Sequence, residues 1–340
     1  MSAPLPVEII GGGPAGLAAG LALQRSGVPV TVFEAAGYPR HRVCGEFISG
    51  LDDGTVARLG LRGLLADARP HRSVTYFLRG RPLPAYALPA PALGISRHAL
   101  DARLAGAFVA AGGDLRTHTR MPEDETPPGR VFAAGRRRQG PFWVGLKVHV
   151  RNLRLASDFE VHLGERAYVG LSSVETGAVN VCGLFAQRPL AQRGLELMPS
   201  YLEACGLGAL ADRLGAAQLD PATFCVTAAA LGDRRVGSPD RVWIGDACAT
   251  IAPFTGNGLA MALQGADLAT GPLLAYSVGR TDWGESIRAI AAAQARRFRR
   301  RLAVSSLLHP FFLERRRQSV LAALVRWRLV PFHAFYAALH

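Results

Sequence analysis

The segment at residues 7–34 constrains the fold more than any other part of the chain, because it combines two short apolar strands, a glycine-rich turn and a helix. VEII at 7–10 predicts the first strand, and VPVTVFE at 28–34 predicts the second. Between them, GGGPAG at 11–16 contains a G-x-G-x-x-G pattern and opens a predicted helix over 17–25. Elements of these kinds in this order are typical of a Rossmann-like unit that binds a dinucleotide.

Each glycine of the G-x-G-x-x-G pattern has its own task in such a unit. Gly11 permits the tight turn, Gly13 lets the main chain approach a pyrophosphate, and Gly16 brings helix and strand together. The N-terminus of the helix offers free N–H groups to phosphate oxygens. Glu34 closes the second strand, where a carboxylate can accept hydrogen bonds from both hydroxyls of a ribose.

A second glycine-rich motif indicates which dinucleotide is bound. Residues 241–269 predict an apolar strand that ends in Gly245-Asp246, a loop that reaches Pro253, and a helix that opens at 256–258. Asp246 can hold a hydroxyl of a ribityl chain. The N–H groups at the helix N-terminus can stabilise negative charge on a reduced flavin ring. The two motifs together predict FAD.

With both motifs, the chain resembles the FAD-dependent oxidoreductases of the p-hydroxybenzoate hydroxylase type, the group A flavin monooxygenases. R-x-V-C-G-E-F-I-S at 42–49 is more similar to the geranylgeranyl reductase branch, and the resemblance spans about residues 7–270. It implies an FAD-dependent oxidoreductase that acts on a small hydrophobic substrate of polyketide or isoprenoid type. Hydroxylation through a flavin hydroperoxide and hydride transfer to or from a C=C bond both remain open.

The resemblance also implies the architecture. We expect an α/β fold with a Rossmann-like FAD-binding domain (three-layer ββα), an inserted, mainly antiparallel β-sheet substrate domain and a helical C-terminal tail. The expected division is a discontinuous FAD-binding domain at 1–60, 92–140 and 236–290, a substrate-covering domain at 61–91 and 141–235, and a basic amphipathic tail at 291–340.

Further contacts to FAD are implied by the resemblance. Arg97 heads the helix in ISRHALDARLAGAFVAAGGDL (95–115) and should reach the phosphate or ribityl region. The strand that follows is expected to end near the adenine at Met121, and Arg42 is expected to meet the phosphates or the ribityl chain. The residues expected to bind FAD are Gly11, Gly13, Pro14, Ala15, Gly16, Glu34, Ala35, Arg42, Cys44, Gly45, Arg97, Met121, Gly135, Asp246, Pro253, Gly256, Asn257 and Gly258.

The octapeptide VCGEFISG at 43–50 raises the question of what its cysteine does. Cys44 can be a buried core residue, a residue that shapes the loop under the flavin ring, or a reactive thiol. By resemblance the loop lies near the isoalloxazine. No partner base or resolving cysteine is visible in the sequence, so we expect Cys44 to line the site without chemistry of its own, while keeping it as a catalytic candidate.

Two departures from the hydroxylase pattern concern the reductant. Where the hydroxylases carry an Asp-Gly segment, VFAAGRRRQG at 131–140 keeps Gly135 but lacks the acid. The link PEDETPPGR at 122–130 is too short for the strands that usually intervene there. No second glycine-rich unit provides a nicotinamide domain. We therefore expect NAD(P)H to reduce the flavin either directly, in a transient complex, or through a reductase partner.

The substrate side is predicted from alternating apolar and polar residues over 141–185. Lys147 and His149 lie two residues apart and therefore share one face of a strand. If that face meets the flavin, they can bind an anionic or phenolate substrate or act as acid and base. The alternative is a solvent-exposed face. Tyr168 and Asn180 are further candidates, and no sequence pattern predicts a metal site.

Charge is concentrated at the C-terminal end. Residues 288–340 contain eleven arginines and one acid, Glu314, a net of +10 out of +13 for the chain. Apolar residues at helical spacing make this segment amphipathic, so its helices either pack on the FAD-binding domain or lie on an anionic membrane. No recognition module accompanies the charge, so nucleic acid is not an expected partner.

The remaining features bear on compartment and on an alternative function. Five scattered cysteines without a C-x-x-C pair favour reduced thiols in the cytoplasm. No signal peptide and no spanning segment is predicted. The expected location is cytoplasmic, with peripheral attachment to the inner face of the membrane as the second possibility. The alternative function is a flavin-binding, membrane-associated partner protein with little turnover of its own.

Overall fold

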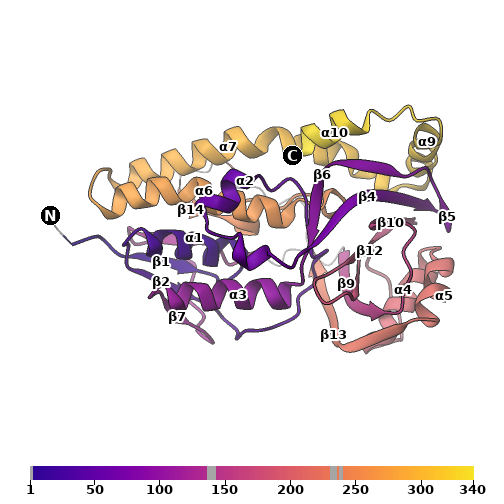
Figure 1. Ribbon diagram of the computed structural model, residues 1–340, viewed down its shortest axis with the longest axis horizontal. Coiled ribbons are helices and arrows are strands. Elements are labelled where there is room, and N and C mark those ends of the chain that lie inside the picture. Colours follow the sequence, from indigo (N-terminus) through magenta and orange to yellow (C-terminus); the bar gives the residue numbers. More distant parts are fainter. Residues whose placement is uncertain (1–2, 136–142, 230–235, 237–239) are drawn as a thin grey trace.

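The computed structural model describes residues 3–135, 143–229, 236 and 240–340. Two β-sheets lie side by side in it, and long C-terminal helices run along one flank of both (Figure 1). The N-terminal motif builds the first sheet, and the alternating segments build the second.

The first sheet is parallel throughout and contains the two strands of the predicted dinucleotide unit. β1 pairs with β2 on one side and with β8 on the other. The strands, in spatial order, are β14 (Val242–Trp243), β8 (Arg130–Phe132), β1 (Val7–Ile10), β2 (Val30–Phe33) and β7 (Asp114–Arg116).

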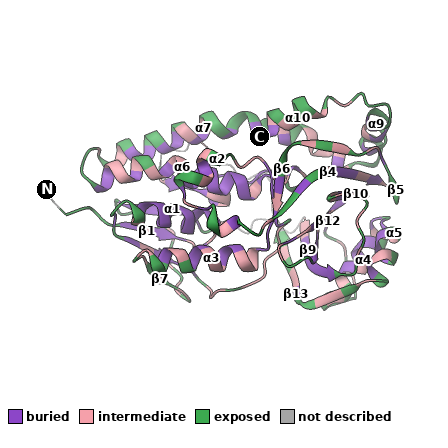
Figure 2. Ribbon diagram, in the orientation of Figure 1, coloured by how far each residue is buried: buried purple, intermediate pink, exposed green. Residues whose placement is uncertain are grey.

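Helices cover one face of this sheet. α1 is buried over most of its length, because its alanines and glycines allow α3 and α6 to pack closely against it. α7 packs on α6 and also meets α10, α8 and β14, while its outer side is exposed (Figure 2). The helices of this layer are α1 (Pro14–Arg25), α2 (Asp53–Arg58), α3 (Arg97–Ala110), α6 (Gly258–Ser277) and α7 (Trp283–Leu308).

The opposite face of the parallel sheet has no second β-layer between β7 and β8, as the short link predicted: residues 117–129 contain no strand. Arginines lie over its aromatic side chains instead, with Arg241 stacked on Phe132 and Trp243. One expectation was wrong here. β7 ends at Arg116 and does not extend to Met121, because the chain turns after three paired residues.

The second sheet has nine strands and is mainly antiparallel, with one parallel pair between β10 and β4. Its strands, in spatial order, are β13 (Gln218–Ala229), β9 (Trp143–Arg151), β12 (Val179–Ala186), β11 (Ala167–Ser173), β10 (Phe159–Gly164), β4 (Arg69–Leu78), β6 (Tyr86–Gly94) and β3 (Phe47–Ile48), with β5 (Arg81–Pro82) beside β4.

The two faces of this sheet differ in chemistry. Leu146, Val148 and Val150 of β9 join an apolar core with α4 (Leu197–Ala204) and α5 (Gly208–Gly215). Lys147 and His149 alternate with these residues along β9, so their side chains lie on the opposite face of the second sheet. That face packs against the segment that contains Glu46. Alternation with period two therefore buries a polar face between the two sheets.

The tail is helical, as expected, and continues α7 with α8 (Pro310–Leu313), α9 (Arg315–Arg326) and α10 (Phe332–Leu339). Short 3-10 helices occupy Gly63–Leu65, Gly194–Glu196, Gly245–Ala247 and Pro253–Thr255. Among the described residues, no helix combines the length and apolar character needed to cross a bilayer.

The predicted fold class is confirmed in its Rossmann-like unit, its mainly antiparallel sheet and its helical C-terminal region. The expected second β-layer of a three-layer ββα domain is not formed by residues 117–129, because the link there is too short. The exact division into domains stays a prediction. β3, at 47–48, lies within the segment expected for FAD binding but pairs with β6 of the second sheet. The segment around residue 47 therefore joins the two sheets.

Candidate flavin-binding site

The glycine-rich turn is shaped by close main-chain packing. A Cβ atom at Gly11 would collide with the carbonyl of Ala133, and a Cβ atom at Gly16 would collide with the carbonyl of Gly11. Gly11 also has φ +114°, a conformation that favours glycine. The turn is therefore held in one shape before any ligand arrives.

Other predicted glycines face open space instead. A Cβ atom at Gly13, Gly45, Gly135 or Gly258 would meet no heavy atom within 4 Å. Gly13 and Gly258 stand at the N-termini of α1 and α6, which have no side-chain cap. These helix ends leave N–H groups for an anionic ligand, and the missing side chains leave room for it to approach.

Glu34 lies at the end of β2 and is buried. Its carboxylate accepts hydrogen bonds from the N–H of Gly12 at 3.0 Å and of Ala36 at 3.1 Å. Arg40 donates to the same carboxylate at 2.6 Å, and Arg42 lies 3.7 Å away. The predicted ribose acceptor therefore stands beside the glycine turn, with two guanidinium groups next to it.

Five buried polar atoms have no hydrogen-bond partner among the described residues: Arg40 Nε, Arg42 Nε, Asn180 Oδ1, Asn257 Oδ1 and, beside Phe332 of α10, Tyr86 Oη. Buried polar groups are almost always paired, so unpaired ones in a cradle point to a ligand. The two arginines adjoin Glu34, and Asn257 stands at the N-terminus of α6. These groups suit the phosphates and polar ring edge of a flavin dinucleotide.

The segment 43–50 passes between the two sheets. On the side of the second sheet, the carbonyl of Cys44 accepts a hydrogen bond from Asn180 Nδ2 at 3.0 Å. The carbonyl of Gly45 accepts one from Ser172 Oγ at 3.3 Å. The first half of the octapeptide is thus bound to strands β12 and β11.

The second half of the octapeptide is bound to the region around α6. The N–H of Ser49 donates to the carbonyl of Gly256 at 3.3 Å, and Gln264 Nε2 donates to the carbonyl of Gly50 at 2.9 Å. The ring of Phe47 lies where a side chain at Gly256 would be. This segment therefore aligns the second glycine motif with the second sheet.

Cys44 has the environment of an unreactive thiol. Burial raises the pKa of its thiol, and the nearby charge of Arg97 only partly opposes this. Its sulfur accepts a hydrogen bond from the N–H of Glu46 at 3.3 Å. A thiol with a raised pKa supplies little thiolate at neutral pH, which supports a lining role.

Arg97 is held by a side chain that sequence reasoning missed. Its guanidinium makes two hydrogen bonds to Asp101, at 2.6 and 2.7 Å, one turn later on α3. Asp101 is fully buried, and Arg42 lies 3.9 Å from it. The spacing R-x-x-x-D within a predicted helix was the signal that could have identified this pair.

Lys147 and His149 are buried rather than on a solvent-exposed face, and Glu46 brings them together. Glu46 Oε1 lies 3.1 Å from Lys147 Nζ, and Oε2 lies 2.6 Å from His149 Nε2. Lys147 Nζ also lies 3.0 Å from His41 Nδ1. Sequence reasoning missed Glu46 and His41, although both belong to the loop whose cysteine drew attention.

His41, Glu46 and His149 have the mutual spacing of metal ligands. The ammonium group of Lys147 contacts both His41 and Glu46, however, and thereby supplies the cation of this cluster. Burial and the charge of Lys147 lower the pKa of His41 to about 4, so its ring is neutral and its Nδ1 accepts a hydrogen bond from the ammonium group.

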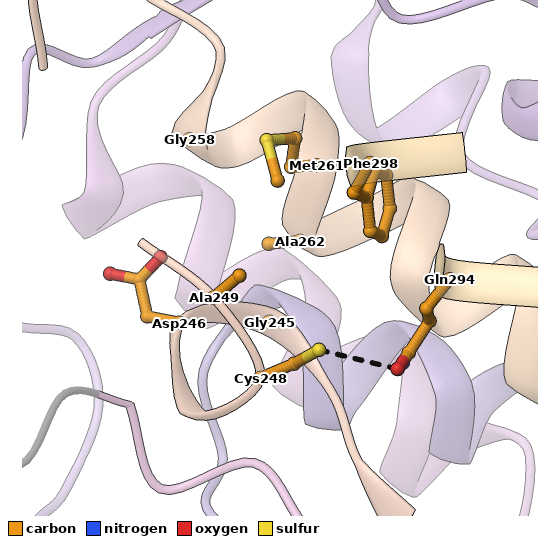
Figure 3. A pocket seen from close by; sticks show the side chains of 9 residues that line it. All are labelled: Gly245, Asp246, Cys248, Ala249, Gly258, Met261, Ala262, Gln294 and Phe298. Atoms are coloured by element: carbon orange, nitrogen blue, oxygen red, sulfur yellow. Dashed lines mark hydrogen bonds between the residues drawn. The ribbon is translucent and has the colours of Figure 1, made fainter. Parts of the chain in front are cut away.

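Asp246 lies in the short 3-10 turn that follows β14 and lines a small pocket (Figure 3). In the close-up, its carboxylate points away from Cys248 and Gln294. Gln294 of α7 accepts a hydrogen bond from the Cys248 sulfur at 3.2 Å and donates to the carbonyl of Trp243 at 2.7 Å. Helix α7 thus fixes the loop that carries Asp246.

Comparison with known proteins supports the assignment of a dinucleotide-binding unit at the N-terminal end of the chain. Residues 9–79 match the family described as NAD(P)-binding Rossmann-like domain. Menaquinone reductase of Mycolicibacterium smegmatis is 28% identical over 138 residues, which are 39% of this chain and 34% of that protein. The match therefore spans about a third of the relative's length.

Solved structures resemble nearly the whole chain. Klebsiella pneumoniae HpxO, in complex with FAD and uric acid, has a TM-score of 0.77 at 17% identity and covers 98% of this chain and 96% of its own. A geranylgeranyl bacteriochlorophyll reductase-like protein of Thermoplasma acidophilum has a TM-score of 0.72 at 17% identity, with coverages of 98% and 95%. P. aeruginosa PqsL, in complex with 2-aminobenzoylacetate, has a TM-score of 0.70 at 14% identity, with coverages of 92% and 98%.

These likenesses define a class. The chain shares its fold with a protein described as a probable FAD-dependent monooxygenase, with an FAD complex and with a geranylgeranyl bacteriochlorophyll reductase-like protein, and this is the fold that its two glycine motifs and the 42–49 segment predicted. Both branches to which the sequence pointed are present among the structural neighbours.

Proposed function

We propose that this protein is an FAD-dependent oxidoreductase acting on a small hydrophobic substrate. The observation that carries the proposal is a cradle formed by the two glycine motifs and the octapeptide. Its glycines have no heavy atom where a Cβ would lie, and buried polar atoms beside them have no hydrogen-bond partner among the described residues. The structural neighbours support it, since HpxO is in complex with FAD and uric acid, and PqsL with 2-aminobenzoylacetate.

The residues fit FAD as follows. Glu34 would accept the ribose hydroxyls, and the N-terminus of α1 beyond Gly13 would bind the pyrophosphate. Asp246 would hold the ribityl chain, and the N-terminus of α6 at Gly258 would face the ring system. Bound FAD would supply two-electron redox chemistry, while the protein binds, orients and shields the substrate.

Two reactions remain candidates: hydroxylation of an electron-rich ring, and hydride transfer to or from a C=C bond. The octapeptide and the menaquinone reductase match favour the reductase branch, and the likeness to PqsL, described as a probable FAD-dependent monooxygenase, favours the monooxygenase branch. NAD(P)H is the proposed reductant, either directly or through a reductase partner. Anaerobic reduction followed by air, with product analysis for candidate phenols and polyprenyl substrates, separates the two reactions.

The substrate surface next to the octapeptide is apolar and aromatic. Phe47 stacks on Phe159 of β10 with ring centroids 4.3 Å apart. Phe254, in the second glycine motif, stacks on Phe312 of α8 at 3.9 Å. These rings are contributed by the second sheet, by the second glycine motif and by α8, and they support a hydrophobic, unsaturated substrate.

The test of FAD binding uses a glycine whose replacement the protein itself can accommodate. Gly13→Ala places its methyl group in open space, so the variant should fold normally and yet obstruct the pyrophosphate. We expect FAD affinity to fall at least about tenfold, measured by quenching of FAD fluorescence. Gly106→Ala, also in open space but on α3, is the matched control. If the wild-type protein takes up no FAD, the proposal is overturned. If Gly13→Ala binds FAD as tightly as the wild type does, the pyrophosphate does not bind at Gly13.

We also propose that the C-terminal helices dock on an anionic membrane surface. Large apolar side chains stand exposed there, with Leu307 72% and Trp327 74% accessible, and Leu329, Val320 and Leu324 nearby in sequence. Arginines at 315–317, 326 and 328 accompany them. Exposed apolar residues with surrounding arginines fit a bilayer containing anionic lipid. A surface of this kind would suit a lipid-like substrate.

The alternative function is a flavin-binding, membrane-associated partner protein with little turnover of its own. Both proposals include the FAD-binding site and the membrane-docking surface. They differ in whether Lys147 and His149, on the buried polar face of the second sheet, take part in a reaction. Lys147→Ala and His149→Ala variants that leave every flavin reaction unchanged would favour the alternative.

A further inference from the structure

Three ionisable side chains are buried together where the octapeptide crosses β9. Glu46 and Lys147 have no exposed surface, and the side chain of His149 is 8% exposed. Moving charged groups out of water opposes folding by several kcal/mol for each ion, and well-packed apolar residues would often be at least as stable. Stability alone therefore does not account for this cluster.

The main chain at Glu46 is also strained. Its φ of 52° lies in the left-handed region, which disfavours a non-glycine residue by about 1–2 kcal/mol. The main chain is held there by two hydrogen bonds, from its N–H to Cys44 Sγ and from the N–H of Ile95 to its carbonyl. This conformation aims a carboxylate, which glycine would lack, at the polar face of β9.

The hydrogen bonds of the carboxylate are fully accounted for. Oε1 accepts from the N–H of Arg97 at 3.0 Å and lies 3.1 Å from Lys147 Nζ, while Oε2 lies 2.6 Å from His149 Nε2. Burial alone would raise the pKa of Glu46, but the hydrogen bond from His149 and the charge of Lys147 lower it below its ordinary value. The carboxylate is therefore ionised, and His149 Nε2 is the donor.

In the neutral form of the ring, this pairing leaves the other nitrogen of His149 as an acceptor. Nδ1 has no hydrogen-bond partner in the described part of the chain. Asn180 lies directly opposite His149 on β12, and its Oδ1 is likewise unpaired. Directly opposed residues on antiparallel strands have Cβ atoms about 4.5–5.5 Å apart. Two unpaired acceptors at this spacing call for a ligand that donates a hydrogen.

We propose that Glu46 and His149 form the acid–base pair of this oxidoreductase and that its substrate carries a hydroxyl group, as a phenol or an enol, beside Asn180. The inference rests on the proposed function. His149 Nδ1 takes the hydroxyl proton: the O–H bond breaks, an N–H bond forms, and the electron pair stays on oxygen. The imidazolium is stabilised by Glu46, which is a positioning residue, and His149 returns the proton in the reverse step.

Lys147 has a supporting part in this arrangement. Its ammonium group keeps Glu46 ionised and links the carboxylate to His41, whose ring stacks on that of His98 at 4.7 Å. His41 and His98 are only partly buried, so this line of groups leads from the buried pair towards solvent.

The chain contains a matched pair that serves as an internal control. His162 Nε2 lies 2.8 Å from Glu160 Oε2 on β10, and both side chains are buried. They belong to the opposite face of the same sheet, where Arg213 of α5 binds Glu160 at 2.9 Å. This pair is chemically similar to the first but lies away from the octapeptide.

The test uses 4-nitrophenol, whose phenolate absorbs at a longer wavelength than the phenol. The measurement is made at a pH well below the pKa of free 4-nitrophenol, where little of the free ligand is phenolate. In FAD-loaded wild-type protein, difference spectra should then show at least a tenfold higher phenolate fraction in the bound ligand than in free ligand. His149→Asn and Glu46→Gln should lose this gain, and Glu46→Asp should restore part of it. His162→Asn should retain the full gain.

The outcomes that would overturn the inference are distinct from failure of the proposed function. An undiminished phenolate fraction in His149→Asn removes the pair from the chemistry, and no binding of 4-nitrophenol overturns the phenol class. In ¹⁵N spectra of the imidazoles, a protonated Nδ1 of His149 at neutral pH would likewise overturn it, whatever ligand is used. Failure of FAD uptake overturns the proposed function alone, because the phenolate measurement can be repeated on the flavin-free protein.

Discussion

At the scale of single residues, charged groups in this protein are buried only with several partners. Glu160 is an example: it accepts hydrogen bonds from His162, from Arg213 and from the N–H of Ala156. Burial alone would raise its pKa, but these donors lower it from 4.5 to about 2. Glu46 follows the same rule on the opposite face of the sheet.

The lowered pKa of Glu160 predicts how stability depends on pH. Because the folded-state pKa lies below the unfolded value, its stabilising effect is complete above pH 4.5 and is lost as pH falls towards 2. We expect a loss of about 2 kcal/mol from this group at pH 3. Urea unfolding at pH 7 and pH 3 should show a smaller acid-induced loss in Glu160→Gln than in wild type. Equal losses in both proteins would contradict the prediction.

At the scale of elements, α9 and the turn after it determine how the tail meets its surroundings. Gln318 of α9 donates to the carbonyls of Gly164 and Phe312, at 2.7 and 3.0 Å, and so fixes the helix to β10. Ala322 and Val325 are buried, while Val320 and Trp327 remain exposed. One face of α9 thus packs against the rest of the protein, and the other face is exposed and can contact a membrane.

The membrane proposal makes a prediction for this element. Vesicles of phosphatidylcholine with phosphatidylglycerol should sediment with the protein, and vesicles of phosphatidylcholine alone should bind much less. High salt should weaken the interaction, because each arginine near an anionic surface contributes about 1 kcal/mol. Trp327→Ser with Leu329→Ser should reduce binding several-fold, whereas Val109→Ser, an exposed apolar residue on α3, should have no effect. Equal binding to both vesicle types would refute an anionic surface.

At the scale of the whole molecule, the octapeptide couples the two sheets. It is hydrogen-bonded to β11 and β12 on one side and to the region of α6 on the other. A ligand in the cradle between these elements stabilises the folded state by mass action, by about 2.7 kcal/mol at a concentration of 100 Kd. Because the octapeptide is bound to both sides, we expect a ligand to raise the free energy of unfolding of both sheets together.

Two tryptophans can test this coupling, since Trp143 lies in β9 and Trp243 in β14. Variants that retain only one of them, with phenylalanine at the other tryptophan positions, should unfold with the same midpoint by fluorescence. FAD should raise both midpoints equally. A shift of the Trp243 midpoint alone would show that the ligand stabilises only the parallel sheet.

Much of the fold could be predicted because its signals are local. The glycine turn and Glu34 lie within one βαβ unit, and the alternation in β9 lies within one strand. The end of β7 was missed because pairing with β2, rather than the local sequence, limits that strand to three residues. The unpaired atoms of Asn180 and Asn257 were equally beyond prediction, since pairing depends on every neighbour in space.

The sequence by itself determined the dinucleotide turn, the second glycine motif, the shared face of Lys147 and His149, and the basic amphipathic tail. Each depends on residues close together in the chain, whose geometry follows from helical or strand periodicity. Only the tertiary structure decided that Glu46 joins Lys147 and His149, which are about a hundred residues away. That contact requires a strained loop between two sheets, and no local pattern encodes the meeting of distant segments in a buried space.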